Sequence, residues 1–270
     1  MIERIDEIAV LPHVVYKVLE LSATTDTAAT EIERAIVIDP GFSTRLLALA
    51  NSAFYALPRR VTSIRDAVAF LGYKQIRQLA MTVGFFDMFV GKNDKESLRR
   101  RAWWRHSIDS AICCRWLAQE TKKLPPEDAY TCGLLHYIGK PLLDRHQAGG
   151  YEQVDQLMAV HQYSELEAEA TVFGCHHVEV AIGACTRWRM PERLLHALNY
   201  QTIVTDDVED AYAIATVALG SSISRMAVDG PASGELPMWA LRMLGFDTFV
   251  TEDLIERAID VVASSRKMQL

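Results

Sequence analysis

Helix-start and helix-stop residues recur along the whole chain with almost no strand signals between them, and this feature constrains the fold most. Such residues satisfy the backbone groups left unpaired at helix ends. The clearest predicted helices are residues 41–51 after Asp39-Pro40, residues 64–71 between Ser63 and Gly72, and residues 165–173 between the capping box of Ser164 with Glu167 and Gly174. Further starts are predicted at Thr30, Pro125-Pro126, Pro191 and Thr251. Apolar residues at three- and four-residue spacing fill these segments, so we predict an all-α fold of about a dozen helices.

A polar stretch, Val90-Gly91-Lys92-Asn93-Asp94-Lys95, predicts a boundary between two parts of the chain. It separates an N-terminal helical bundle, residues 1–92, from a larger helical unit, residues 93–270, and both sizes are ordinary for domains. A second loop is expected at Pro231-Ala232-Ser233-Gly234, too near the C-terminus to leave a further domain behind it.

Composition argues against several classes of protein. The formal net charge of −7 and a pI near 5.6 disfavour a nucleic-acid-binding face over much of the surface. No apolar run reaches the roughly 18 residues that span a bilayer, and Met1-Ile2-Glu3-Arg4-Ile5-Asp6 lacks the apolar core of a signal peptide. Five cysteines without a Cys-x-x-Cys pair are typical of reduced, buried thiols. We therefore expect a cytoplasmic protein that binds neither nucleic acid nor membrane.

Three histidines of the larger unit, His106, His136 and His177, are candidates for a metal site. A neighbouring His-Asp pair offers a divalent metal one imidazole nitrogen and one anionic oxygen. Here Tyr137 follows His136, and phenols stay protonated at neutral pH and replace a carboxylate poorly. Taken singly, each histidine is more simply interpreted as a capped or hydrogen-bonded side chain at a helix end. The pattern indicates a metal-hydrolase scaffold that has lost the means to hold its metal.

Two charged runs have simpler explanations than a site. The basic run Arg99-Arg100-Arg101 with Arg105 could grip a phosphate or an acidic partner, but a solvated helix face is favoured for so short a run. Glu165, Glu167 and Glu169 alternate along a helix and are expected to be solvated rather than to form an acid/base pair.

Two polar motifs are also expected to be structural. Cys175 beside His176-His177 is disfavoured as a nucleophile pair, because adjacent helical side chains point about 100° apart. Asn51-Ser52 could contact a ligand, but at a helix end such residues ordinarily cap or turn the backbone.

Several short motifs occur in an order and spacing that are specific together. They are Leu11-Pro12, Ile38-Asp39-Pro40-Gly41-Phe42, Leu49-Ala50-Asn51-Ser52-Ala53-Phe54-Tyr55, Ala67-Val68-Ala69-Phe70-Leu71-Gly72, Trp104-Arg105-His106-Ser107, Gly133-Leu134-Leu135-His136, Phe173-Gly174-Cys175-His176-His177, and Trp188 with Pro191. Over about residues 11–226 the chain resembles the HDOD family, bacterial signalling domains related to the HD metal-dependent phosphohydrolases. The resemblance implies an N-terminal bundle packed on an HD-like helical subdomain.

By this resemblance, His106 matches the first metal ligand of HD enzymes, His136 the histidine of the His-Asp pair, and His177 a later histidine. Three segments depart from the patterns that the resemblance implies. Tyr137 replaces the aspartate of HD enzymes, Gln201-Thr202 stands where many HDOD chains carry a His-His pair, and Leu219-Gly220-Ser221 stands where HD enzymes place a last carboxylate ligand. Three imidazoles could still take a zinc ion, but they cannot build the bridged site of a two-metal hydrolase. We therefore expect the histidines to be vestigial, with no metal and no other cofactor.

The resemblance implies a non-catalytic domain of a signalling pathway, such as a two-component response regulator. It would bind sensor, receiver or cyclic-dinucleotide enzymes through the N-terminal bundle or through the groove between this bundle and the HD-like unit, with a homodimer left open. Two alternatives stand beside it, namely a metal-dependent phosphohydrolase with unusual ligands and a nucleotide-binding sensor. HDOD domains often occur beside other domains, so a longer parent protein also stays open.

Overall fold

The computed structural model describes residues 11–22, 29–91, 94–230, 235–246 and 251–265. None of these residues lies in a strand, which confirms the all-α prediction. The helices are α2 (His13–Ser22), α3 (Ala29–Val37), α4 (Pro40–Ala50), α5 (Ile64–Phe86), the 3-10 helix η2 (Asp87–Phe89), α6 (Asp94–Thr121), α7 (Pro126–Leu135), α8 (Gly139–His146), α9 (Gly150–His161), α10 (Glu165–Phe173), α11 (His177–Arg187), α12 (Glu192–Ala197), α13 (Ala211–Asp229), α14 (Met238–Leu244) and α15 (Thr251–Ser265). The predicted boundary between residues 92 and 93, the loop at 231–234 and the N-terminal residues 1–6 lie outside the described residues.

Capping hydrogen bonds confirm the helix ends predicted at Asp39, Ser164 and Gly174, whereas α3 begins at Ala29, one residue before the predicted start at Thr30. The side chain of Asp39 accepts the backbone N–H of Phe42 at 2.9 Å, and α4 begins at Pro40. Ser164 opens α10 in a complete capping box, and Gly174 ends that helix with a left-handed φ of 77°. These contacts are local in sequence, which is why the residue pattern alone could place them.

The long helix α5 is broken where the sequence predicted a stop. Ser63 caps its start by accepting the backbone N–H of Asp66 at 3.0 Å. Gly72 has φ 77° and ψ 168°, a backbone conformation that glycine adopts at little cost, so α5 consists of two helices across a kink. The part after the kink carries the buried Met81 and Phe85 toward the rest of the molecule.

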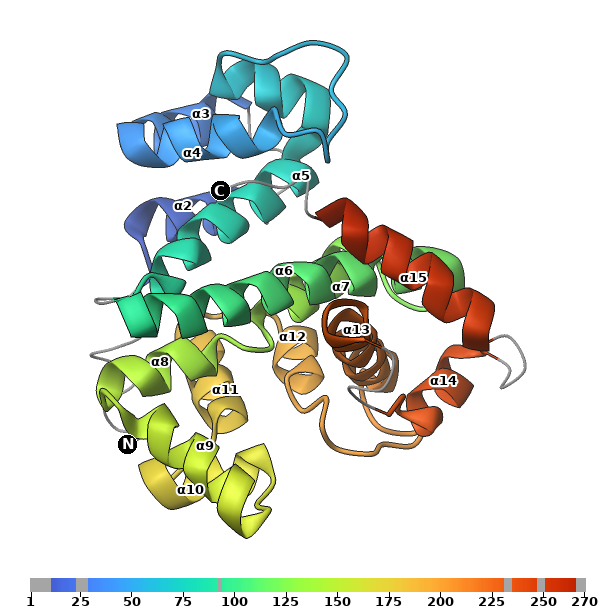
Figure 1. Cartoon of the computed structure of the whole chain (residues 1–270). Helices are drawn as coiled ribbons and strands as arrows, with labels where there is room; N and C mark the ends of the chain where they lie inside the picture. Colours follow the sequence, from blue (N-terminus) through green and yellow to red (C-terminus); the bar gives the residue numbers. More distant parts are fainter. Residues whose placement is uncertain (1–10, 23–28, 92–93, 231–234, 247–250, 266–270) are drawn as a thin grey trace.

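The helices are arranged around α6, which crosses the middle of the molecule (Figure 1). Helices α7, α13 and α15 pack against α6. Figure 1 shows α2 to α5 on one side of α6, α8 to α11 together on the other, and α13 to α15 near its C-terminal half. The residues that match the HD histidines therefore come from helices that surround α6 or belong to it.

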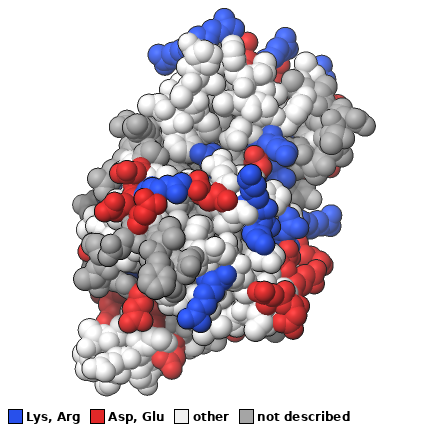
Figure 2. Space-filling model, turned by 90° about the vertical axis from the view of Figure 1, so that its right-hand side faces the viewer, with Lys and Arg blue, Asp and Glu red and all other residues white. Residues whose placement is uncertain are grey.

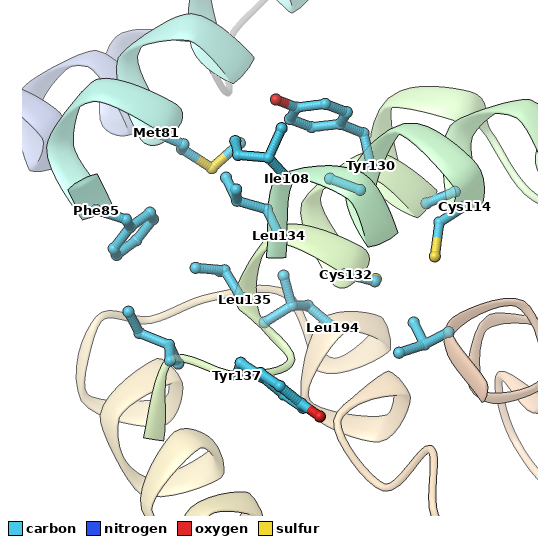
Figure 3. Packing of buried hydrophobic residues seen from close by; sticks show 14 of the residues in the cluster. Met81, Phe85, Ile108, Cys114, Tyr130, Cys132, Leu134, Leu135, Tyr137 and Leu194 are labelled. Atoms are coloured by element: carbon cyan, nitrogen blue, oxygen red, sulfur yellow. The ribbon is translucent and has the colours of Figure 1, made fainter. Parts of the chain in front are cut away.

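One continuous hydrophobic cluster joins the N-terminal helices to the rest of the chain. In Figure 3, Met81 and Phe85 of α5 face Ile108 of α6 and Leu134 and Leu135 of α7. All five side chains are at most 5% exposed. The division at residues 92 and 93 stays a prediction, since the core is shared across it.

One described helix, α13, is long and apolar enough by composition to span a membrane, although no uninterrupted apolar run marks it in the sequence. Of its most apolar stretch, 72% is buried inside the molecule, which is the environment of a core helix. Figure 2 shows a face on which acidic and basic side chains are interspersed, and no basic surface covers that face.

Arg100 corrects the prediction that the basic run 99–101 is a solvated face. Arg100 is 1% exposed, its Nε donates to Asp144 Oδ2 at 2.6 Å, and its guanidinium also donates to the carbonyl of Val90. Asp144 lies on α8, so the counter-charge comes from a helix distant in sequence and fastens α6 to α8. Arg101 is exposed, as predicted.

Asn51 turns the backbone as predicted. Its side-chain amide donates to the carbonyls of Leu47 and Val61, both at 2.8 Å, and its oxygen accepts the N–H of Val61 at 2.8 Å. The loop between α4 and α5 is therefore closed by one side chain.

Candidate functional site

Ser221 joins two of the three candidate histidines. Its Oγ lies 3.1 Å from Nε2 of His106 on α6 and 3.2 Å from Nε2 of His136 at the end of α7. Ser221 is 1% exposed and lies on the buried face of α13. A single hydroxyl thus occupies the position between two imidazoles in which an HD enzyme would place metal and carboxylate.

The direction of these hydrogen bonds follows from His136. Its Nδ1 lies 2.6 Å from the carbonyl of Gly133, which can only accept, so Nδ1 carries the proton and Nε2 accepts from Ser221. Burial lowers the pKa of His136 to about 3, although the bond to Gly133 acts in the opposite direction. His136 is therefore neutral at physiological pH, and its remaining nitrogen is already bonded.

Two more serines extend the network around His106. Ser224 Oγ lies 3.2 Å from Nδ1 of His106 and 2.8 Å from Ser110 Oγ. Loss of solvent around the ring, and after it the neighbouring His136, lowers the pKa of His106 well below its usual value. Both nitrogens of His106 therefore have hydroxyl partners within the protein.

The ring of Tyr137 lies among the three histidines. Its centroid is 4.5 Å from that of His106, 4.3 Å from that of His136 and 5.6 Å from that of His177. Tyr137 is 7% exposed and points into the space below α7 (Figure 3). The residue that replaces the HD aspartate therefore fills the site with an aromatic ring instead of offering an anionic oxygen.

His177 is held by a carboxylate that sequence reasoning placed in solvent. Its backbone N–H and its Nδ1 lie 2.8 and 2.7 Å from Glu169 Oε2, and Tyr151 donates its hydroxyl to Glu169 Oε1 at 2.7 Å. Burial alone would raise the pKa of Glu169, but the bond from His177 lowers it, so the carboxylate stays ionised. Burial lowers the pKa of His177, whose Nε2 faces the hydroxyl of Tyr200 at 3.4 Å.

The prediction that Glu165, Glu167 and Glu169 form a solvated face is wrong for two of the three. Glu169 is fully buried because it meets polar groups from α9 and α11. Glu165 is 31% exposed at its side chain and accepts Lys140 Nζ at 2.6 Å. Glu167 alone behaves as a surface residue, in the capping box of α10.

Lys140 supplies a buried positive charge beside the histidines. It is 2% exposed, and its ammonium lies 3.9 Å from the centre of the Tyr137 ring. Burial would lower the pKa of Lys140, but its interactions with Tyr137 and Glu165 outweigh that effect and raise it. The site therefore contains a lysine ammonium that stays positively charged beside Glu165.

These residues do not fit an HD-type metal. Among the described residues, the ligand atoms of His106, His136 and His177 do not form a group within 4.8 Å of one another. The group that does, Glu165 with Glu169 and His177, has its carboxylates bonded to Lys140, Tyr151 and His177. A metal would have to displace an ammonium and break these bonds, which is costly inside a protein.

A second group, His196 with Glu209 and Asp210, lies apart from the histidine cluster. Asp210 already binds Arg193 at 2.9 Å and His196 at 3.0 Å. It is an ion-pair network at the start of α13 rather than a coordination site.

A cavity of about 530 Å³ opens beside the cluster. Tyr137, Glu165 and Ser221 form its inner wall, and Arg225 and Trp239 lie at its rim, with Tyr200, Gln201, Ser222, Met158, Ala218 and Pro237 completing the lining. Gln201, which with Thr202 stands where the resemblance implies a frequent His-His pair, donates to the hydroxyl of Tyr200 at 3.1 Å. The cavity offers hydroxyls, the amide of Gln201, the guanidinium of Arg225 and the carboxylate of Glu165, which is already paired with Lys140.

Comparison with known proteins decides the family. The family model of the HDOD domain matches residues 8–204, well over half of the chain. The chain belongs to the HDOD family. The motifs quoted from the sequence identified this family correctly, and the HD-like helical fold is confirmed with it.

Solved HDOD-like structures share the fold along nearly the whole chain. An HDOD domain protein of unknown function from Geobacter sulfurreducens has a TM-score of 0.77 and 25% identity, covering 97% of this chain and 93% of that one. A Shewanella amazonensis protein named as a candidate phosphohydrolase has a TM-score of 0.76 and 22% identity, covering 99% and 97%. The MmoQ response regulator of Methylococcus capsulatus has a TM-score of 0.51 and 21% identity, covering 90% and 95%. The last two show a common fold alone.

A curated relative is longer than this chain. An uncharacterized protein of Treponema pallidum is 24% identical over 199 residues, which are 73% of this chain. The match spans 38% of that protein's own length.

Proposed function

We propose that this HDOD chain is a non-catalytic, cytoplasmic signal-transduction domain that acts by binding other proteins. One observation carries the proposal: the Ser221 hydroxyl bridges the imidazoles of His106 and His136. A hydrolytic HD site needs those nitrogens free to bind metal, and here they are consumed by internal hydrogen bonds.

The rest of the site supports the same proposal. Hydrolysis at a bridged two-metal site requires anionic oxygen ligands and an activated water. The ring of Tyr137 fills the place of the missing carboxylate, and Lys140 neutralises Glu165. Because the groups at the catalytic positions serve packing and internal hydrogen bonding, the domain acts through contacts at its surface.

A signalling role also agrees with the name of a protein that shares this fold. MmoQ, which shares the fold, is named as a response regulator. We propose that this chain acts in a two-component or related bacterial pathway, where it relays a signal from one protein to another.

The phosphohydrolase alternative can be tested directly. Hydrolysis of p-nitrophenyl phosphate and bis-p-nitrophenyl phosphate is measured with Zn²⁺, Mn²⁺ or Fe²⁺ for the wild-type chain and for Tyr137→Asp combined with Ser221→Asp. We expect no turnover by the wild type. Metal-dependent turnover by the wild type that disappears in His136→Ala would contradict the proposal.

The cavity beside the cluster favours the nucleotide sensor as a second candidate function. Its rim carries Trp239 and Arg225, which makes no ion pair with a described residue. A planar base and a phosphate could meet these two side chains. A rise in melting temperature with nucleotides, absent in Arg225→Gln, would support this second function.

A further inference from the structure

We infer that the groove between α2, α5 and the turn joining α11 to α12 is the docking site for an acidic segment of a partner protein. The inference rests on the proposed function and names the chemistry of the partner. The groove lies away from the histidine cluster and shares no lining residue with the cavity beside it.

The groove consists of two adjoining hollows that share Arg77 and Pro191. The first, about 220 Å³, is lined by Tyr16 and Glu20 of α2 and by residues 188–191 after α11. The second, about 270 Å³, is also lined by Asp128, Thr131 and Cys132 of α7 and by Arg193 and Leu194 of α12. An occupant would therefore touch the N-terminal helices and the HD-like helices together, as a domain that relays a signal requires.

The groove carries excess positive charge. Arg77 is half-buried and Arg189 exposed, and neither makes an ion pair with a described residue. The acidic residues of the groove are already neutralised, since Glu20 accepts Lys17 at 2.7 Å and Asp128 accepts Arg193 at 3.0 Å. In a chain of net charge −7, two guanidinium groups that pair with no carboxylate of the described residues are complementary to the carboxylates of a partner.

The floor of the groove is apolar. Trp188 and Met190 are 5% and 7% exposed, and Trp188 packs on Phe85 with ring centroids 5.3 Å apart. Tyr16 lies at the rim with 40% exposure. Buried aromatic residues ringed by charge are typical of protein-binding hot spots. The segment that fits here carries an apolar side chain between carboxylates.

The backbone at Arg189 points to a role for its side chain. Arg189 donates its N–H to the carbonyl of Thr186 and Met190 donates to Cys185, both at 3.0 Å, which forms a Schellman motif at the end of α11. Its φ is 54°, a left-handed conformation that favours glycine, and Gly174 occupies that conformation at the end of α10. The arginine therefore makes the helix end less stable than glycine would, and the groove gives it a function.

The test uses a fluorescein-labelled peptide of alternating glutamate and leucine, with a glutamine–leucine peptide for comparison. Binding to the full chain is measured by fluorescence polarisation at low and high salt. We expect the acidic peptide to bind at least about tenfold more tightly than the neutral one, with a loss of affinity at high salt. The double variant Arg77→Gln/Arg189→Gln should lose about tenfold or more, whereas Arg59→Gln/Arg60→Gln, an equal change of charge at an exposed pair outside the groove, should lose less than about twofold.

A second variant separates function from folding. Arg189→Gly removes the guanidinium and relieves the left-handed strain, so it should bind the peptide more weakly with an unchanged or higher melting temperature. Equal losses in both double variants, or no binding of the acidic peptide at about 1 mM, overturn the inference. A dimer in light scattering that Arg77→Gln/Arg189→Gln dissociates also overturns it, in favour of a second copy of this chain. None of these outcomes bears on metal binding or hydrolysis, so the non-catalytic proposal stands or falls separately.

Discussion

The hydroxyl of Ser221 lies 3.2 Å from Nε2 of His136, the nitrogen through which this histidine would meet a metal ion. His136 is oriented as a metal ligand would be, with Nδ1 bonded to a backbone carbonyl. What differs is the group in front of it, since a serine of α13 replaces the ion. The scaffold thus keeps the orientation of its histidine and uses it to fasten α7 to α13.

Replacing Ser221 with alanine should destabilise the fold. The nitrogens of His106 and His136 would lose a shared partner in the interior, which costs about 1–3 kcal/mol. Urea unfolding followed by circular dichroism measures the change. Ser222→Ala, at the neighbouring and half-buried position, is the control and should stay within about 0.5 kcal/mol of the wild type. Equal midpoints for both variants would show that the bridge contributes nothing.

Glu169 and Glu167 lie on the same helix, but the same substitution should affect stability at Glu169 and not at Glu167. Glu169→Gln weakens three buried hydrogen bonds from His177 and Tyr151, and we expect a loss of about 2 kcal/mol or more. Glu167→Gln alters an exposed capping residue and should leave the thermal midpoint nearly unchanged. The idea fails if the two variants melt together.

Gly139 is expected to tolerate no side chain. A Cβ at this position would lie 1.9 Å from the carbonyl oxygen of His177, and backbone atoms cannot move aside as a flexible side chain can. Gly139→Ala should therefore cost about 3 kcal/mol by overpacking where α8 meets α11. Gly41→Ala, whose Cβ would approach only the side chain of Asp39 at 3.3 Å, serves as the control in the same denaturation assay. A wild-type midpoint for Gly139→Ala would refute the close approach.

Stability should fall as the pH decreases from neutrality, before carboxylates begin to titrate. The pKa of His136 is lowered to about 3 in the folded chain, against about 6.5 in an unfolded one, so the unfolded state binds more protons between these values. The free energy of unfolding therefore falls with pH in this window, by up to about 1.4 kcal/mol per unit for this residue. Urea titrations between about pH 6.5 and 5 should show this slope, reduced in His136→Asn. An identical slope in the variant would exclude His136 as its source.

Local features of the fold could be predicted from the sequence. The caps at Asp39 and Ser164 and the stops at Gly72 and Gly174 depend on residues within a few positions of one another. The buried charges could not be predicted in this way. Arg100 finds Asp144 on α8, and a pattern along one helix carries no information about such a partner.

The sequence predicts several residues of the candidate site, but not the hydrogen bonds and ion pairs that they form. His106, His136 and Tyr137 do lie together, as the resemblance implied. In the sequence, Ser221 marks only a position where a carboxylate ligand is absent. A serine at that position, opposite two histidines, is also a signal for a hydrogen bond. Lys140 is not among the predicted site residues and Glu169 is wrongly predicted to be solvated, because buried charges look like surface charges in sequence. In the sequence, the position of Lys140 three residues after Tyr137 is the feature that comes nearest to indicating a charge beside the site.

Metal content tests the central claim most directly. The purified chain is analysed by elemental analysis, then treated with chelator and titrated with Zn²⁺, Mn²⁺ and Fe²⁺ while its melting temperature is followed. The account predicts far less than one equivalent of metal and no stabilisation by any of the three ions, because Ser221, Tyr137 and Lys140 occupy the site. One or more equivalents of tightly held metal, lost in His106→Ala and His136→Ala, would contradict it and restore the phosphohydrolase.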